Sequence, residues 1–282
     1  MPSLITNKDQ RPELSTYTQW LVDALSIDPS SLAESTFQTA SSRIKDSFSS
    51  SSFWKDLTSQ HKDWNQEYFI KTGYYLFAGT QNVPDLIVKP FSSFINKTYR
   101  SNILNNRKWP NPPKLRDTEE KAWIQPNNWF ETVNDVVRTT FVVNYLDGVQ
   151  YLADILVGLA KQSDLKHHLA FEARDEGGYY AAHLYIYITC EIPTEDFQVK
   201  TITCPIEIQI KTQLQEFIKN ITHKYYEDRR SIISIIKKEN EVKWQWDYKS
   251  EEFKVNYLGN ILHYLEGMIV EIREQRSRKE KQ

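Results

Sequence analysis

A strict alternation of apolar and polar side chains runs through CPIEIQIKTQ, residues 204–213. Its apolar positions are Ile206, Ile208 and Ile210, and its polar positions are Glu207, Gln209 and Lys211. Alternation with a period of two is typical of a β-strand that turns one face to the core. The chain therefore needs a sheet, and the polar face of this strand is either solvated or lines a cleft.

A second segment, residues 181–190 (AAHLYIYITC), repeats this alternation. His183, Tyr185 and Tyr187 share one face, and Leu184, Ile186 and Ile188 share the other. In one sheet with the first strand, this polar face would gather imidazole and phenol groups beside an acid, an amide and a base. Gly177 and Gly178 stand just before it, next to Tyr179. Paired glycines suit a tight hairpin turn or the close approach of a ligand to the backbone.

Composition excludes several classes of protein. With 40% hydrophobic and 13% aromatic residues in 282, the chain can bury a core and is not a disordered protein. Thirty-five basic and 37 acidic residues give a net charge of −2, so only a local basic patch could bind nucleic acid. Cys190 and Cys204 lack the CxxC spacing of a zinc site and are expected to be reduced core thiols. No apolar run reaches ~18 residues, so we expect a cytoplasmic protein without membrane contact.

Helical and strand-like patterns succeed one another along the chain. Residues 1–80 have helical spacing with serine-rich breaks, such as the one at 47–53, and a helix is expected over 56–79, ending at Gly79. From about residue 129, strands alternate with helices. The tail is expected to form an amphipathic helix, with apolar positions Leu258, Ile261, Leu262, Leu265, Ile269 and Ile272. These patterns predict an α+β (mixed α/β) fold with helical extensions at both ends.

Asp135 stands at the entry of another strand-like run, in NDVVRTTFVV. An acid at a strand end, with a second acid on a neighbouring strand, is how many phosphoryl-transfer sites hold Mg²⁺. Taken alone, an acid in the position of Asp135 is more often a helix or turn cap.

The order of four blocks indicates a family. KPFSSFINKTYR, DVVRTTFVV, GGYYAAHLY and EIQIKTQLQEFIKNITHK follow one another over roughly residues 85–226. In this order they resemble the synthetase domain of the RelA/SpoT family. The most specific block is the last, with His223 eleven residues after Thr212, and the Gly178–His183 block is nearly as specific.

The resemblance implies a nucleotidyltransferase-like mixed β-sheet flanked by helices. It divides the chain into a helical extension at 1–80, a synthetase domain at 81–226 and a C-terminal helical extension at 227–282. It also implies an enzyme, an ATP-dependent pyrophosphokinase that uses Mg²⁺ and moves the β,γ-pyrophosphate of ATP to a ribose 3′-hydroxyl.

Site residues follow from the same resemblance. Asp135 and Glu207 are the expected catalytic residues and metal ligands. Tyr179 and His183 are expected to bind the acceptor, with Gln209 lining the cleft. The residues expected to face the ATP donor are Lys89, Ser93, Lys97, Arg100 and Arg138.

The acceptor block departs from the family pattern, because Tyr180 and Ala181 stand where a basic residue and a hydroxyl are common. With its single synthetase domain, the chain most resembles the toxic members, some of which modify the 3′-CCA end of tRNA. We therefore expect a growth-inhibiting toxin acting on tRNA, with an antitoxin protein as a candidate partner. The basic residues that could bind RNA, or that are simply solvated, are Arg107, Lys108, Lys114, Arg116, Arg229, Arg230 and Lys237.

Two other functions remain open. The first is a small alarmone synthetase that makes ppGpp, pppGpp or ppApp, with a purine nucleotide as the acceptor. The second is a catalytically inactive module that senses nucleotides or binds a partner on the same fold.

Overall fold

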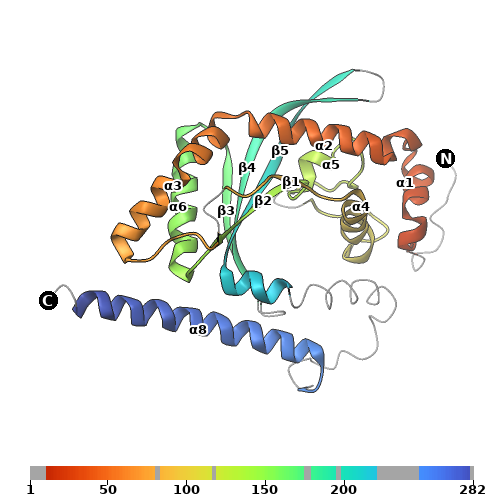
Figure 1. Cartoon of the computed structure of the whole chain (residues 1–282). Helices are drawn as coiled ribbons and strands as arrows, with labels where there is room; N and C mark the ends of the chain where they lie inside the picture. The colour runs from red at the N-terminus through yellow and green to blue at the C-terminus, as the bar shows by residue number, and fades with distance from the viewer. Residues whose placement is uncertain are drawn as a thin grey trace. The chain divides into compact units, whose positions relative to one another are not determined.

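The computed structural model describes residues 11–79, 83–115, 119–174, 179–194, 198–220 and 248–279. Within these residues, five strands form one mixed sheet in the order β1-β2-β5-β4-β3. The strands are β1 (Ile87–Val88), β2 (Val137–Val143), β3 (His167–Arg174), β4 (Tyr179–Pro193) and β5 (Val199–Thr212). Helices accompany the sheet (Figure 1). The predicted α+β fold is confirmed.

The chain forms two compact units, each built from three separate segments. The first holds the described residues up to Ser51 together with Leu86–Arg138 and Ile186–Glu207. The second holds Ser52–Asp85, Thr139–Tyr185 and the described residues from Ile208 onward. Strands β2, β4 and β5 each contribute residues to both units.

Helices from two parts of the sequence build the first unit. They are η1 (Leu14–Thr16), α1 (Tyr17–Leu25), η2 (Pro29–Leu32), α2 (Glu34–Ser49), α4 (Phe91–Tyr99), the π-helical turn η3 (Arg100–Leu104) and α5 (Trp129–Thr132). The ring of Phe37 on α2 packs 4.6 Å from that of Phe94 on α4 and 5.8 Å from that of Phe130 on α5. This aromatic cluster joins α2, α4 and α5. Its ring pairs stabilise the packing of the three helices beyond the burial of apolar surface.

A buried asparagine links the N-terminal helix of this unit to the turn after α4. The Asn102 side chain donates to Tyr17 Oη (2.7 Å) and to the Ile124 carbonyl (2.8 Å), and it accepts from the Ile124 N–H (3.0 Å). Asn102, Tyr17 and Ile124 are all buried. If the Asn102 amide were removed, water could not take its place as their hydrogen-bond partner.

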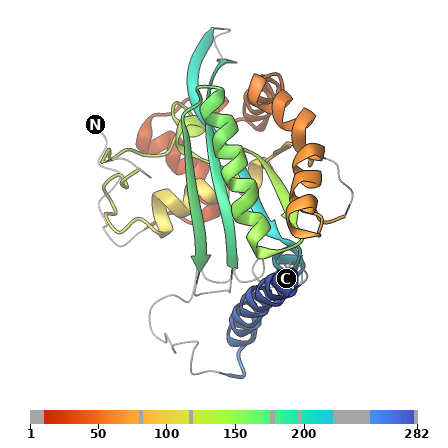
Figure 2. The same ribbon diagram turned by 90° about the vertical axis from the view of Figure 1, so that its left-hand side faces the viewer.

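Helices α3 (Ser52–Thr72) and α6 (Leu146–Gln162) lie side by side in the second unit (Figure 1). Figure 2 shows α6 in front of the sheet, where it contacts β3. As predicted from the serine-rich break, α2 ends at Ser49 and a new helix starts at Ser52. The predicted end of α3 at Gly79 is wrong.

Gly73 is the reason that α3 stops early. Its φ of +79° lies in the left-handed region, which glycine adopts without steric cost and which terminates helices. The backbone N–H groups of Leu76 and Phe77 then bind Asn65 Oδ1 (2.8 and 3.2 Å), and Phe77 forms an isolated bridge with Val143 of β2.

The predicted C-terminal helix is present as α8 (Glu251–Lys279), but its apolar stripe faces solvent. Eight large apolar side chains are 40% to 70% exposed: Tyr257, Leu258, Ile261, Tyr264, Leu265, Met268, Ile269 and Ile272. The side chains that α8 buries include Asn256, Glu266 and Arg273. Among the described residues, no helix is both long enough and apolar enough to cross a bilayer.

Asn102→Ala should lower the free energy of unfolding by about 2–4 kcal/mol, because it leaves buried groups of Tyr17 and Ile124 without their partners. Urea unfolding of the purified variant measures this loss. The exposed neighbour Asn105, changed to Ala, is the matched control and should shift stability by less than about 0.5 kcal/mol. Equal effects of the two changes would contradict the structural role of Asn102.

Candidate functional site

The centre of the candidate site is the carboxylate of Asp135, which two lysines bind. Lys89 Nζ lies 2.9 Å from Asp135 Oδ2, and Lys97 Nζ lies 2.7 Å from Asp135 Oδ1. The Lys89 N–H also donates to the Val136 carbonyl (2.8 Å), which extends the β1–β2 pairing to the edge of the site. The sequence predicted all three charged residues as site residues, and the structure brings them together within the first unit.

Helix α4 carries the other predicted donor residues. Ser93, Lys97 and Arg100 are spaced by four and three residues, so they share one face of the helix and of the π-helical turn after it. The helix starts directly after Pro90, whose carbonyl accepts the Phe94 N–H (2.9 Å). Ser93 is exposed, and Lys97 and Arg100 are half-buried. The face is therefore open to a ligand.

The lysines keep Asp135 ionised. Burial by itself would raise the pKa of this carboxyl, but the charges of Lys97 and Lys89 outweigh it and lower the pKa from 3.8 to about 2. The pKa of Lys89 is lowered by burial, and the nearby positive charges of Lys97 and Arg138 add to that effect against the pull of Asp135. Arg138 is thus close enough to Lys89 to influence its pKa.

A recess reaches this cluster. Its volume is about 540 Å³, and Lys89 lines it together with Val88, Pro90, Phe91 and Ser92. The opposite wall comes from α2, with Glu34, Phe37, Gln38, Ser41 and Ser42. The recess therefore gives a nucleotide-sized molecule access to Lys89.

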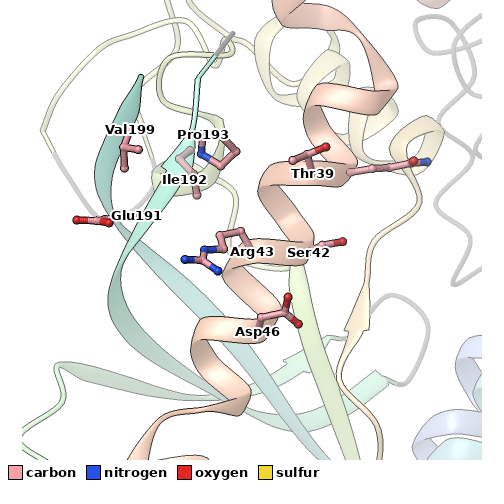
Figure 3. Close-up of a pocket in the computed structure, with 9 residues that line it drawn as sticks. Thr39, Ser42, Arg43, Asp46, Glu191, Ile192, Pro193 and Val199 are labelled. Atoms are coloured by element: carbon pink, nitrogen blue, oxygen red, sulfur yellow. The ribbon is translucent and has the colours of Figure 1, made fainter. Parts of the chain in front are cut away.

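A second recess in the same unit, of about 600 Å³, lies between α2 and the β4–β5 hairpin. Figure 3 shows Arg43 reaching from α2 toward the strand that carries Glu191. None of the predicted site residues lines this recess.

The polar face of β5 is covered. Glu207 is 5% exposed and Lys211 is 1% exposed, so the alternative of a solvated face is wrong. The Lys211 ammonium pairs with the Glu216 carboxylate, and burial lowers the pKa of Lys211 to about 8. Glu207 lies in the first unit together with Asp135.

Two of the predicted acceptor residues, Tyr179 and His183, meet in the second unit, which also contains Gln209. Tyr179 Oη and His183 Nε2 are 2.9 Å apart on β4, and Gln209 is half-buried on β5. The rings of His183 and Tyr185 stack 6.3 Å apart, as the predicted shared face requires. On β3, His168 stacks on Tyr185 at 6.2 Å; sequence reasoning missed it, because spacing along one strand does not show what a neighbouring strand supplies.

The predicted RNA-binding residues are described only in part. Arg107 and Lys108 are exposed, and Lys114 pairs with Glu119 at 2.7 Å on the surface. Trp109, which follows the first two, packs against Trp20 of α1 at a ring distance of 5.6 Å, so it anchors this loop. The other predicted positions lie outside the described residues: Arg116, Arg229, Arg230 and Lys237, as do Gly177, Gly178 and His223 of the matched blocks.

In the part of the chain that the structure describes, no three or more His, Cys, Asp and Glu side chains gather into a metal-binding group. Asp135 still offers an ionised carboxylate in the unit that also holds Glu207. Carboxylate oxygens suit Mg²⁺, which in nucleotide sites is held by one or two of them together with substrate phosphates. By residue type, Asp135 and Glu207 suit a magnesium–nucleotide complex.

Comparison with known proteins supports the fold. The chain is similar to the small alarmone synthetase 1 of Bacillus subtilis bound to its product pppGpp, with 16% identity, a TM-score of 0.50, and coverage of 79% of this chain and 92% of that one. The small alarmone synthetase 2 of the same organism (18% identity, TM-score 0.44, 78% and 93% covered) and a GTP pyrophosphokinase family protein of Streptococcus pneumoniae (16%, 0.44, 86% and 93%) also match. No family model and no curated protein sequence matches the chain. At this identity the first likeness confirms the predicted fold.

The low pKa of Asp135 predicts a pH-dependent contribution to stability. A carboxyl whose pKa falls from 3.8 to about 2 on folding contributes about 2 kcal/mol above pH 4, and this is lost as the pH falls toward 2. The difference in unfolding free energy between the wild type and Asp135→Asn should therefore shrink by that amount between pH 5 and pH 2, as measured by urea titrations at each pH.

Lys97→Met serves as the companion variant, since it removes one of the two ammonium groups that lower this pKa. It should flatten the same pH dependence. A difference between wild type and Asp135→Asn that stays constant from pH 5 to pH 2 would show that the lysines do not hold the carboxyl.

Proposed function

We propose that this protein is a Mg²⁺-dependent pyrophosphokinase of the RelA/SpoT type, which moves pyrophosphate from ATP to a ribose 3′-hydroxyl. The observation that carries the proposal is the Asp135 carboxylate between two lysine ammonium groups, beside a recess that one of them lines. The shared fold adds support, since the synthetase with that fold is described with pppGpp bound. Transfer of this kind needs mainly positioning and charge neutralisation, which such a cluster provides.

The donor site would use the lysines in two ways. Without nucleotide, Lys89 and Lys97 neutralise Asp135. When a triphosphate enters, its oxygens compete for the same ammonium groups, and the side chains of Ser93, Arg100 and Arg138 would add further donors. Asp135 and Glu207 would hold Mg²⁺, which supplies neutralisation of the phosphate charge. The low pKa of Asp135 means that no proton must leave it first.

The acceptor would bind through Tyr179 and His183 of β4 and through Gln209 of β5. The phenol ring suits stacking on a base, and the imidazole that contacts its hydroxyl suits a ribose or phosphate oxygen. The ribose 3′-oxygen bonds to the β-phosphorus of ATP, the bond from that phosphorus to the α,β-bridging oxygen breaks, and AMP leaves. The hydroxyl proton passes to a base, the role we assign to Glu207.

For the acceptor class, we propose the 3′-CCA end of tRNA, and hence a growth-inhibiting toxin that blocks translation and pairs with an antitoxin protein in the cytoplasm. The exposure of Arg107 and Lys108 on a loop anchored by Trp109 supports this, because basic contacts dominate affinity for nucleic acids. The second candidate is a small alarmone synthetase acting on a purine nucleotide, which the pppGpp complex of the structural neighbour favours.

The activity is tested with γ-labelled ATP, Mg²⁺ and separate acceptors: GDP, GTP, ATP or AMP, and deacylated tRNA. The wild type should transfer label to one class. Asp135→Asn and Glu207→Gln should reduce the rate at least ~10²-fold, because each removes a proposed metal ligand or base. Asp63→Asn, an exposed change on α3, is the control. No transfer to any acceptor by folded wild type would favour the inactive module instead.

The tRNA acceptor is tested by charge reversal. Arg107→Glu with Lys108→Glu should weaken tRNA modification most at moderate salt and reduce the dependence of apparent affinity on salt, because fewer counterions are released. Lys55→Glu, at an exposed site on α3, should leave the reaction unchanged. Label that moves only to a soluble nucleotide, or tRNA modification insensitive to the double reversal, would exclude this loop as an RNA contact.

A further inference from the structure

Helix α8 buries its polar side rather than its apolar one. Its large apolar side chains are exposed, while Glu266 is 3% and Arg273 is 7% exposed. Burying a charged group costs free energy unless specific partners compensate, whereas burying the apolar stripe would be favourable outright. The orientation of α8 in the second unit is therefore set by particular polar contacts, and those contacts show what the helix does.

The first of these contacts is with Tyr180 on β4. The Tyr180 hydroxyl donates to Glu266 Oε2, and its ring lies 3.9 Å from the imidazole of His263, centroid to centroid. Tyr180 and Glu266 are both buried. Burial and the neighbouring Glu266 carboxylate raise the pKa of Tyr180 well above its ordinary range, so the hydroxyl stays a donor at any physiological pH.

Two further side chains complete this contact. Thr212, the last residue of β5, lies close enough to Tyr180 and to Glu266 to oppose the rise that burial causes in the pKa of each, and Gln215 does the same for Tyr180. The Gln215 N–H also donates to Thr212 Oγ1 at 3.1 Å, where the helix at 213–220 begins. Thr212 and Gln215 are almost completely buried, so these polar groups form a buried contact that joins β4, β5 and α8, in which Glu266 Oε1 has no hydrogen-bond partner among the described residues.

A second, separate contact anchors α8 further along its length. Arg273 Nη1 donates to Tyr68 Oη (3.2 Å), Arg273 Nη2 binds Asp147 Oδ2, and the Tyr68 hydroxyl donates to the same carboxylate (2.8 Å). The guanidinium also lies 5.0 Å from the ring centre of Tyr145. This anchor holds α8 to α3 and α6 about two helical turns beyond Glu266, through contacts that do not involve Tyr180.

Tyr180 is the residue next to Tyr179, and successive side chains of a strand point to opposite faces. Contacts that hold Tyr180 on one face of the strand therefore also fix the backbone at Tyr179. On the other face, this backbone positions the Tyr179–His183 contact. We propose that Glu266 and His263 of α8 are positioning residues that act through Tyr180. They position the acceptor motif, by which we mean Tyr179 and His183. The positioning of Tyr179 and His183 is inferred from these contacts, and the effect of the positioning on catalysis rests on the proposed function.

The kinetic test uses Glu266→Leu, Tyr180→Phe and their combination, with Glu271→Leu as the matched change on the exposed side of the same helix. Misplacement of the acceptor motif should raise the KM for the acceptor about tenfold and leave the KM for ATP within about twofold. The double variant should be no worse than the worse single one, because both remove the same contact. An unchanged acceptor KM, or equal changes in both KM values, would overturn the proposal.

Hydrogen–deuterium exchange of the same variants tests the positioning without any activity. Glu266→Leu and Tyr180→Phe should speed exchange in peptides that cover residues 179–185, and Glu271→Leu should not. Tyr180→Phe removes a single oxygen and carries the test alone if Glu266→Leu does not fold. Unchanged exchange at 179–185 in folded variants overturns the positioning role, whereas absence of transfer by the wild type overturns only the proposed function.

Discussion

The candidate donor site is built around the largely buried carboxylate of Asp135, which both Lys89 and Lys97 contact. A charge in that position is tolerated only because Lys89 and Lys97 each supply an ammonium within hydrogen-bonding distance. To do so, one lysine must follow the short strand β1 and the other must lie on α4 two turns into the helix. The pairing of β1 with β2 and the start of α4 after Pro90 therefore together bring both lysines to Asp135.

The sequence predicts the parts of the site that are local. Alternation identified β4 and β5, whereas the shared helical face of Ser93, Lys97 and Arg100 is a finding of the structure. The resemblance to a family then linked Asp135 to the lysines, which lie 46 and 38 residues away. Periodicity alone could not make that link, since it carries no information on contacts between distant segments.

What sequence reasoning missed has a common physical cause. Apolar spacing correctly predicts that α8 is an amphipathic helix, but not which side faces the protein, and the polar contacts of Glu266 and Arg273 decide it. Similarly, one left-handed glycine, Gly73, ends α3 where the apolar pattern continues. Long-range hydrogen bonds and single backbone conformations override periodic patterns in both cases.

The direct measurement of the central claim is calorimetric titration with α,β-methylene-ATP, with and without Mg²⁺, at constant ionic strength. If the cluster around Asp135 is a triphosphate site, the wild type binds in a Mg²⁺-dependent manner, and Lys97→Met weakens binding at least ~10-fold. Lys161→Met, at an exposed site on α6, leaves it unchanged. Binding of equal strength in all three proteins, or none to the folded wild type with Mg²⁺ present, would contradict the account.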